Sequence, residues 1–464
     1  MRTFLAVVFL AALAPSCGQR EIALGDHVAV GAVVPDLAWG GVDESGEHAT
    51  IRLRDYAGGG TLIVRVQGGF WCGTCNWQAA HTGEALATGA RVLDLVIGDR
   101  ENAPATARDA FDWRASLDVK DHVAVAADPT FAFRSILDGA LPLVVTIDTS
   151  TMTIVRAESN PAPDGALVDG MFNRREWDMI RAVRTPEVFA SGDPSEIELG
   201  RALFEDTELS PAHVGCVTCH DPRRAFADDR PVAIGAARGD RHTPRIALAA
   251  LSPSQFWDGR ARTLEEQAKG PIENAAEMGS SPAFVAARVA SAHRSAFDSI
   301  FPSAQGDDEI LADVAKAIAT YERSLRVKPN ALDAYAAGDF AALSFPEKQG
   351  LAAFARQGCM QCHWGPRLTD DAFHVTRTPT GRADGAPDVG RADHLGAFKT
   401  PSLRGVGHAK FFAHGGVIDS LDAMVESYGD GDANDARSVG VREPWIPRFG
   451  ETTRWSIVKL ARTL

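Results

Sequence analysis

The sequence predicts a multidomain protein, with an α/β domain at the N-terminus followed by two mostly α-helical lobes. Strand-forming runs alternate with helical stretches in residues 20–160, which is typical of a sheet with crossover connections. From about Pro186 the strand pattern fades and helical periodicity replaces it. Two Cys-x-x-Cys-His motifs lie far apart in this second part, and each leaves room for a lobe around it, at 186–340 and 341–464.

The order of elements in the first domain supports the α/β prediction. Helical composition separates β-rich runs, and it occupies residues 76–87 and 106–117. The β-rich runs predict strands at 61–66, 91–97, 123–126 and 143–147.

A turn-rich stretch follows, and residues 161–185 are predicted to form a linker. Beyond it, apolar residues recur at helical spacing in 197–204, 283–292, 310–325 and 347–357. Long loops rich in Gly, Pro and Arg separate these helices. Loops of this length are expected where a cofactor supplies part of the core.

Composition narrows the class of protein and of partner. The 464 residues suit two to four domains at about 150 residues each. Hydrophobic residues make up 45% and charged residues 23%, as in soluble globular proteins. The net charge of −14 argues against nucleic acid as a partner and suits a basic redox partner.

The first 17 residues are typical of an export signal. Arg2 is followed by an apolar run, residues 4–14, that is too short to span a bilayer as a helix. The segment ending in Cys17 resembles a bacterial lipobox, which predicts lipidation of Cys17 and membrane anchoring; plain cleavage near Cys17 is the alternative. Either way, the mature protein is expected in the periplasm or cell envelope, where oxidised cysteine pairs and haem attachment both occur.

Cysteine spacing carries the strongest chemical signal. Of the seven cysteines, Cys17 lies at the export signal and the other six form three Cys-x-x-Cys pairs. Two pairs are followed directly by histidine: Cys216 and Cys219 by His220, and Cys359 and Cys362 by His363. In this motif two thiols add across the vinyl groups of a haem, and the histidine ligates its iron. Half of a zinc site is the alternative, but a histidine directly after the second cysteine is poor geometry for zinc. The sequence therefore predicts two covalently bound c-type haems.

Residues 186–464 resemble the bacterial diheme cytochrome c peroxidases and their MauG-type relatives. Several motifs in the same order carry the match, at residues 199–204, 216–226, 256–279, 359–366 and 399–428. The resemblance implies two cytochrome-c-like lobes whose haems face a common interface. It also implies that hydrogen peroxide binds at the first haem, held by His220, in the 186–340 lobe, and that the haem of the 341–464 lobe transfers electrons.

The same resemblance places Gln267 and Glu277 beside the first haem, as catalytic residues. Splitting an O–O bond needs a group that takes a proton from one oxygen and returns it to the other, and a carboxylate in a partly apolar pocket does both near neutral pH. An ordinary exposed or capping carboxylate is the alternative for Glu277. Trp257 falls where the family has an aromatic residue between the haems, where it relays electrons; a packed core tryptophan is the alternative.

The sequence departs from the family at the first haem and at a calcium site. Family members often have a second histidine on the first haem, but the corresponding residues 234–241 contain none. We therefore expect a five-coordinate first haem. His242 aligns with an asparagine that helps to hold calcium in the family, and imidazole suits that hard cation poorly, which argues against calcium here.

At the second haem, Tyr428 takes the position of the methionine that the peroxidases use as sixth iron ligand. A phenolate lowers a haem potential, since axial ligands shift it by on the order of 0.8 V. Tyr428 as ligand resembles the MauG-type branch. The alternatives are Met424, His408, His414 or no sixth ligand.

Residues 71–75, with Cys72 and Cys75, resemble the active sites of thioredoxins and redoxins. They follow a predicted strand and begin a predicted helix, whose N-terminus stabilises a thiolate. Residues 140–142 fit the cis-proline loop of that family. Cys72 would be the nucleophile and Cys75 the resolving cysteine. A static disulfide is the alternative, and the fold class implied for residues 20–160 is thioredoxin-like.

Three functions follow from these features. The leading one is a diheme peroxidase that reduces hydrogen peroxide at a five-coordinate haem, with electrons passed through a second haem from a small cytochrome or cupredoxin. The second is a MauG-type enzyme that uses peroxide to oxidise side chains of a protein substrate, which Tyr428 favours. The third is a non-enzymatic electron carrier that links thiol redox to cytochromes; Glu277 and Gln267 argue against it.

Overall fold

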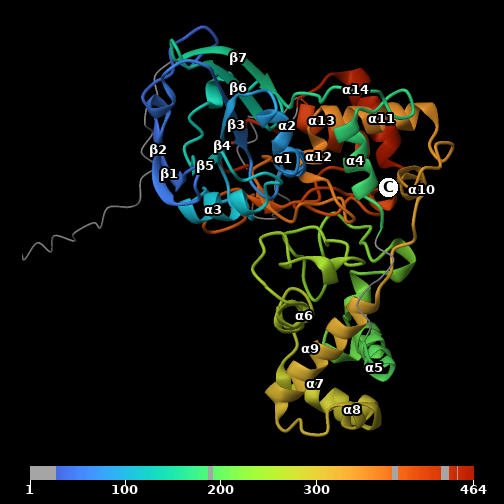
Figure 1. The fold of residues 1–464 in the computed structure, drawn as a ribbon. Helices are drawn as coiled ribbons and strands as arrows, with labels where there is room; N and C mark the ends of the chain where they lie inside the picture. The colour runs from blue at the N-terminus through green and yellow to red at the C-terminus, as the bar shows by residue number, and fades with distance from the viewer. Residues whose placement is uncertain (1–27, 186–191, 379–384, 430–437, 447) are drawn as a thin grey trace, which may run out of the picture.

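A seven-stranded sheet occupies the N-terminal third of the chain, and helices joined by long loops occupy the rest (Figure 1). The computed structural model describes residues 28–185, 192–378, 385–429, 438–446 and 448–464. The predicted export signal, with Cys17, lies outside the described residues and stays a prediction. Of the helices described, none combines the length and the apolar character needed to cross a membrane.

The sheet has the strand order β2-β1-β5-β4-β3-β6-β7. Its centre is parallel, because β3, β4 and β5 run in one direction, while β6 and β7 are antiparallel to their neighbours. The strands are β1 (Ala38–Val42), β2 (His48–Arg52), β3 (Thr61–Gln67), β4 (Arg91–Val96), β5 (Val123–Ala127), β6 (Leu143–Asp148) and β7 (Thr153–Ser159). The four predicted strands are confirmed, and they are the adjacent strands β3 to β6, which are rich in apolar residues.

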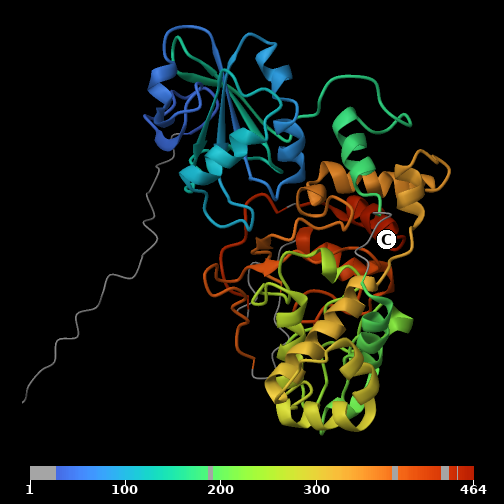
Figure 2. The same cartoon turned by 60° about the horizontal axis from the view of Figure 1, so that its bottom comes forward.

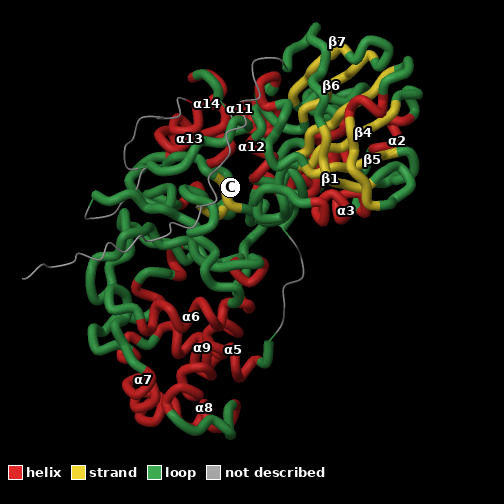
Figure 3. The backbone as a smooth tube through the Cα atoms, turned by 90° about the vertical axis from the view of Figure 1, so that its left-hand side faces the viewer, coloured by secondary structure: helices red, strands yellow, loops and turns green. Residues whose placement is uncertain are grey.

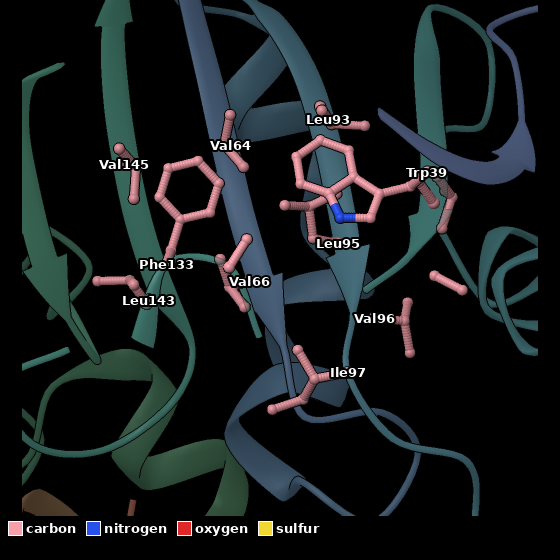
Figure 4. Packing of buried hydrophobic residues seen from close by; sticks show 14 of the residues in the cluster. Trp39, Val64, Val66, Leu93, Leu95, Val96, Ile97, Phe133, Leu143 and Val145 are labelled. Atoms are coloured by element: carbon pink, nitrogen blue, oxygen red, sulfur yellow. The ribbon is translucent and has the colours of Figure 1, made fainter. Parts of the chain in front are cut away.

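Crossover helices cover the faces of this sheet: α1 (Gly73–Ala79), α2 (Thr82–Leu86) and α3 (Ala107–Ala115). A capping box starts α3, where the Thr106 N–H donates to Asp109 Oδ2 at 2.8 Å. The core forms where β-branched and leucine side chains of β3 and β4 meet aromatic residues from outside these strands, Trp39 and Phe133 (Figure 4). All of these side chains are buried.

One ion pair is built into the sheet beneath α1 and α2. Arg65 of β3 and Asp94 of β4 are register partners, each at most 1% exposed. Arg65 Nε donates to Asp94 Oδ1 at 2.6 Å and its Nη2 to Asp94 Oδ2 at 2.9 Å. The hydroxyl of Thr82 and the indole N–H of Trp113 complete the set of hydrogen bonds. A buried pair is tolerated when its remaining polar atoms are satisfied in this way.

The connectivity confirms the predicted thioredoxin-like fold. The Cys72 to Cys75 turn follows the central strand β3 and begins α1, and a cis peptide bond joins Leu141 to Pro142 directly before β6. A disulfide joins Cys72 and Cys75.

In the remaining chain the described regular elements are nearly all helices, and these helices pack in two groups (Figures 2 and 3). In the first group α9 packs against α5, α6 and α7. This group contains α5 (Pro194–Glu205), α6 (Leu264–Glu273), α7 (Pro282–Arg288), α8 (Arg294–Ile300) and α9 (Asp307–Ser324). Leu203, Phe204 and Ile318 lie in its core.

In the second group α11 packs against α14. This group contains α4 (Arg174–Ala182), α10 (Ala331–Ala336), α11 (Phe345–Arg356), α12 (Cys359–Cys362), α13 (Leu421–Gly429) and α14 (Glu451–Ala461). A two-stranded sheet of β8 (Phe373–His374) and β9 (Phe398–Lys399) lies in the loops nearby. The stretch predicted as a linker, 161–185, contains α4, which buries Met179 and Ile180 in this second core. The domain limits themselves stay predictions.

Candidate functional site

The first Cys-x-x-Cys-His motif forms a short 3₁₀ turn, Cys216–Thr218, and ends at His220. The Nδ1 of His220 donates to the Phe226 carbonyl at 3.3 Å, which leaves Nε2 as the free lone pair. Burial lowers the pKa of His220 to about 4, so the ring is neutral. A neutral imidazole oriented through Nδ1 is the form in which histidine ligates a metal.

The second motif has the same design. Gly358, at φ 94°, starts the short helix α12 that carries Cys359 and Cys362. His363 Nδ1 donates to the Leu368 carbonyl at 3.0 Å, and burial lowers the pKa of the ring. Burial likewise raises the pKa of both thiols to about 12.

Both motifs open into one cavity of about 840 Å³. All but one of the predicted haem-site residues line it; the exception is Cys216, which packs in the core of the first helical group. The cavity lining includes Cys219, His220, Trp257, Gln267, Glu277, Cys359, Cys362, His363 and Tyr428. Residues distant in sequence thus converge on one space between the two helical groups.

The residues present fit two haems. None of the four motif cysteines is in a disulfide, so each thiol is available for a thioether bond. Arg245 lies on the cavity wall with its buried Nε lacking a hydrogen-bond partner among the described residues, and burial lowers the pKa of its guanidinium to about 10. A buried guanidinium with an unsatisfied donor suits a carboxylate partner, such as a porphyrin propionate.

Glu277 follows α6 and faces the cavity near the first motif. Burial raises the pKa of its carboxyl, although Arg260 and a 2.9 Å hydrogen bond from Asn274 Nδ2 oppose the shift. Gln267 lies on α6 and is half-buried at the same cavity wall. The structure therefore brings the two predicted distal residues to one side of the first motif's cavity.

Trp257 lies where segments from both helical groups meet. Its indole N–H donates to the His242 carbonyl at 2.8 Å, and its own carbonyl accepts from Lys399 N–H at 2.8 Å. The ring also makes an edge contact with His414, with centroids 6.5 Å apart. Trp257 thus lines the cavity that both motifs share, and its position between two haems stays a prediction.

Residues 234–241, where family members often carry a second histidine ligand for the first haem, lie against Glu277. Ala236 N–H donates to the Glu277 carbonyl at 2.6 Å, and a Cβ added at Gly235 would meet the Glu277 backbone at 2.3 Å. His242 is buried, and its Nδ1 lies 3.2 Å from the carbonyls of Arg230 and Pro231.

A guanidinium joins two carboxylates beside His242. Arg241 Nη1 donates to Asp258 and its Nε to Asp388, both at 2.7 Å. Arg241 therefore pairs with both carboxylates beside His242, and the absence of calcium stays a prediction.

Tyr428, on α13, faces the cavity near the second motif, and burial raises the pKa of its hydroxyl, with Cys362 and Cys359 adding to the shift. The alternatives Met424, His408 and His414 line the same cavity. His414 stacks on Phe398 with 3.6 Å between ring centroids.

Sequence reasoning missed several buried ionisable groups on the cavity wall. Burial raises the pKa of Glu322 to about 8, and its Oε2 has no hydrogen-bond partner among the described residues. Lys399 has a pKa lowered to about 8 by burial and donates to Ser252 Oγ at 3.0 Å. Lys399 begins one of the family motifs, but neither its burial nor that of Glu322 can be read from local spacing, because distant segments bury both side chains.

Cys72 and Cys75 lie outside this cavity lining, at the N-terminus of α1. The Cys75 N–H donates to Cys72 Sγ at 3.2 Å, and both sulfurs are fully buried. Figure 1 shows α1 beside α12, so the third cysteine pair lies near the second haem motif.

Known proteins share this arrangement. The solved structure of a MauG-like protein associated with microbial copper homeostasis matches 61% of this chain and 92% of its own, with TM-score 0.52 and 27% identity. The diheme peroxidase BthA from Burkholderia thailandensis shares the fold, with TM-score 0.53 over 65% of this chain and 93% of its own, at 23% identity.

Sequence comparison is more specific. The family model for di-haem cytochrome c peroxidase matches residues 194–341. Cytochrome c551 peroxidase of Pseudomonas aeruginosa is 36% identical, covering 50% of this chain and 71% of the relative. The methylamine utilization protein MauG of Methylorubrum extorquens is also 36% identical, covering 51% of this chain and 69% of the relative. With its two Cys-x-x-Cys-His motifs on one cavity, this chain belongs to the di-haem cytochrome c peroxidase and MauG family.

Proposed function

We propose that the chain is an exported diheme c-type cytochrome peroxidase that reduces hydrogen peroxide. The observation that carries the proposal is the shared cavity, where two neutral, oriented histidines and a carboxyl of raised pKa converge. Family membership supports the same reaction. A small cytochrome or cupredoxin would donate the electrons, and the acidic surface suits a basic donor.

The six motif residues would hold the haems covalently, in two cytochrome-c-like lobes. Cys216, Cys219 and His220 would bind the first, and Cys359, Cys362 and His363 the second. When bound, the haems supply the redox-active iron that peroxide reduction requires.

Glu277 acts as the proton carrier in this proposal. Its carboxylate takes the proton from one peroxide oxygen and returns it to the other as the O–O bond breaks. With two electrons from the donor and two further protons, both oxygens leave as water. The raised pKa matches this task, because a group that both accepts and donates works best when its pKa lies nearer the working pH. Gln267 has an amide that donates one hydrogen bond and accepts another, so it orients peroxide beside Glu277. Trp257 supplies an aromatic path between the helical groups.

A MauG-type enzyme that oxidises a protein partner is the second candidate. Tyr428 supports it, because this residue lines the shared cavity and because Cys362 and Cys359 contribute to the raised pKa of its hydroxyl. A phenolate ligand stabilises ferric and higher states of iron, which suits storage of oxidising equivalents.

Replacing Tyr428 by methionine tests the ligand assignment. We expect the midpoint potential of one haem to rise. The rise should be a sizeable part of the range of roughly 0.8 V over which axial ligands shift haem potentials. Spectroelectrochemical titration measures it. Tyr321→Phe, on α9 in the core of the first helical group, is the matched control and should leave both potentials in place. An unchanged potential in Tyr428→Met would exclude Tyr428 as a ligand.

The proposed function is tested on protein from a host that matures c-type cytochromes. The denatured mass should contain two haems, and the ferric spectrum should show one high-spin haem that responds to peroxide. Two low-spin haems that ignore peroxide would establish the electron carrier instead. Turnover with a reduced small cytochrome then separates the peroxidase from the MauG-type enzyme.

A further inference from the structure

The Cys72–Cys75 turn of the thioredoxin-like domain packs directly on the second haem motif. A Cβ added at Gly73, between Cys72 and Cys75, would lie 2.6 Å from the Trp364 ring and 2.9 Å from the Met360 carbonyl. The indole N–H of Trp364 donates to the Trp71 carbonyl at 2.8 Å. The two Cys-x-x-Cys turns therefore touch, backbone against backbone.

The cis-proline loop holds the same segment from the other side. The Leu141 N–H donates to Gln361 Oε1 at 3.3 Å, and a Cβ added at Gly358 would lie 2.8 Å from that of Ala140. Residues 358–364 thus cross the face of the domain where both the disulfide and the loop lie, as a bound peptide would.

Cys362 takes part in this contact. It packs against the hydrophobic core cluster that contains Cys72 and Cys75. Its Sγ lies 3.5 Å from His374 Nε2, and the His374 ring contacts Trp71 with centroids 4.8 Å apart. One cysteine of the haem motif therefore faces the domain that carries the disulfide.

An external thiol protein has no access to this disulfide in the folded chain. Cys72 and Cys75 are both 0% exposed, and Trp71 is 1% exposed. A dithiol that reacts with a disulfide needs contact between sulfur atoms. The segment that packs against this turn contains Cys359 and Cys362, so it brings a second cysteine pair next to Cys72 and Cys75.

We propose that the Cys72–Cys75 pair is a built-in reductant for the second haem motif, which it keeps open for haem attachment. The inference rests on the proposed covalent haems. The Cys72 thiolate attacks a Cys359–Cys362 disulfide and forms a mixed disulfide, which Cys75 resolves. The Cys72–Cys75 disulfide forms, the Cys359–Cys362 disulfide breaks, and two electrons and two protons pass to Cys359 and Cys362.

The chemistry of haem attachment creates the need for this step. Thioether bonds form from thiols, whereas an oxidising compartment converts closely spaced cysteines into disulfides. One exchange per chain is sufficient, because haem attaches to the motif once. No external reductant enters the balance, and the product is the buried Cys72–Cys75 disulfide that the structure contains.

The first motif provides an internal control. Cys216 packs in the core cluster of the first helical group, and that cluster contains no residue of the thioredoxin-like domain among the described residues. The turn that carries Cys216 packs against α5. Removal of the dithiol is therefore expected to affect one motif and not the other.

The test expresses the full chain with Cys72→Ser and Cys75→Ser together, in a maturation host that lacks its own thiol reductants for cytochromes. Mass spectrometry of peptides measures haem at each motif. We expect the double variant to lose most haem at Cys359 and Cys362 and to keep it at Cys216 and Cys219. Trp113→Phe perturbs the same domain core without touching the thiols, and its ratio of second-motif to first-motif haem should equal that of wild type.

Equal haem at both motifs of the double variant would overturn the inference and leave the proposed peroxidase intact. Absence of haem from the wild-type protein would contradict both this inference and the proposed peroxidase function. The single variant Cys75→Ser gives a second readout, because Cys72 should then remain in a mixed disulfide with Cys359 or Cys362. Peptide mapping without reductant detects that bond; a free Cys72, or one bonded only to other thiols, contradicts the proposal.

Discussion

Glu277→Gln is expected to slow the reaction with peroxide by about 10²–10⁴-fold, the usual contribution of a positioned acid–base group. Glutamine keeps the shape and the hydrogen bond to Asn274 but carries no proton for transfer. Rapid mixing of the ferric protein with peroxide, followed by absorbance, measures the rate. Haem content should be unchanged, since Glu277 belongs to neither motif.

The pH profile supplies an independent check on Glu277. Burial raises the pKa of this carboxyl above its ordinary value of 4.5, so the base form disappears at a higher pH than for an exposed glutamate. The wild-type rate should therefore fall as pH decreases through that raised pKa, and the fall should be absent in Glu277→Gln. Glu273→Gln, an exposed position on α6, is the matched control. Equal rates for Glu277→Gln and wild type would remove the residue from the mechanism.

Asp94→Asn is expected to destabilise the thioredoxin-like domain by about 3–5 kcal/mol, because it leaves the buried Arg65 guanidinium without its counter-charge. Asparagine has nearly the same volume, so the loss is electrostatic and not a cavity effect. The full chain has more than one folding unit, which makes a single unfolding midpoint unsuitable. Hydrogen exchange of the β3 and β4 amides measures the opening free energy locally.

A paired variant separates charge from packing. Replacing both partners, with Arg65→Met and Asp94→Leu, removes the buried charges together and should restore most of the lost stability. The surface pair of Arg108 and Asp112 is the reference, since disruption of an exposed pair costs only about 0–1 kcal/mol. A cost below about 1 kcal/mol for Asp94→Asn would show that water reaches Arg65.

Much of the fold was predictable, because its central strands have apolar sequence patterns that indicate a strand without knowledge of the tertiary structure. The strands β3 to β6 are rich in apolar residues, and a strand buried on both faces needs such residues wherever it pairs. The strands β1, β2 and β7 were missed, because they carry glycine, polar or charged residues that form strands only beside a sheet already present. Helix α4 was assigned to a linker for a related reason: its few apolar residues gain burial only in the core of the second helical group.

The candidate site was predictable where chemistry imposes a spacing. Haem attachment fixes the order of cysteine, cysteine and histidine within one turn, and the family motifs carried Gln267, Glu277 and Trp257. Arg245 and Glu322 have no such spacing. Their importance comes from burial, which brings a guanidinium and a carboxyl to the cavity wall from separate segments.

The sequence by itself determined the redox chemistry of this protein: three cysteine pairs, two of them with an adjoining histidine, and an α/β domain before a helical one. Only the tertiary structure decided which pairs meet. The turn at Cys72 and Cys75 lies against α12 and not against the first motif. Hydrogen bonds between distant segments fix this contact, because Gln361 accepts from the cis-proline loop and Trp364 donates to Trp71. The spacing of residues within a motif is local and can be read from the sequence. Contacts between distant segments depend on which surfaces become buried on folding, and no short motif encodes that.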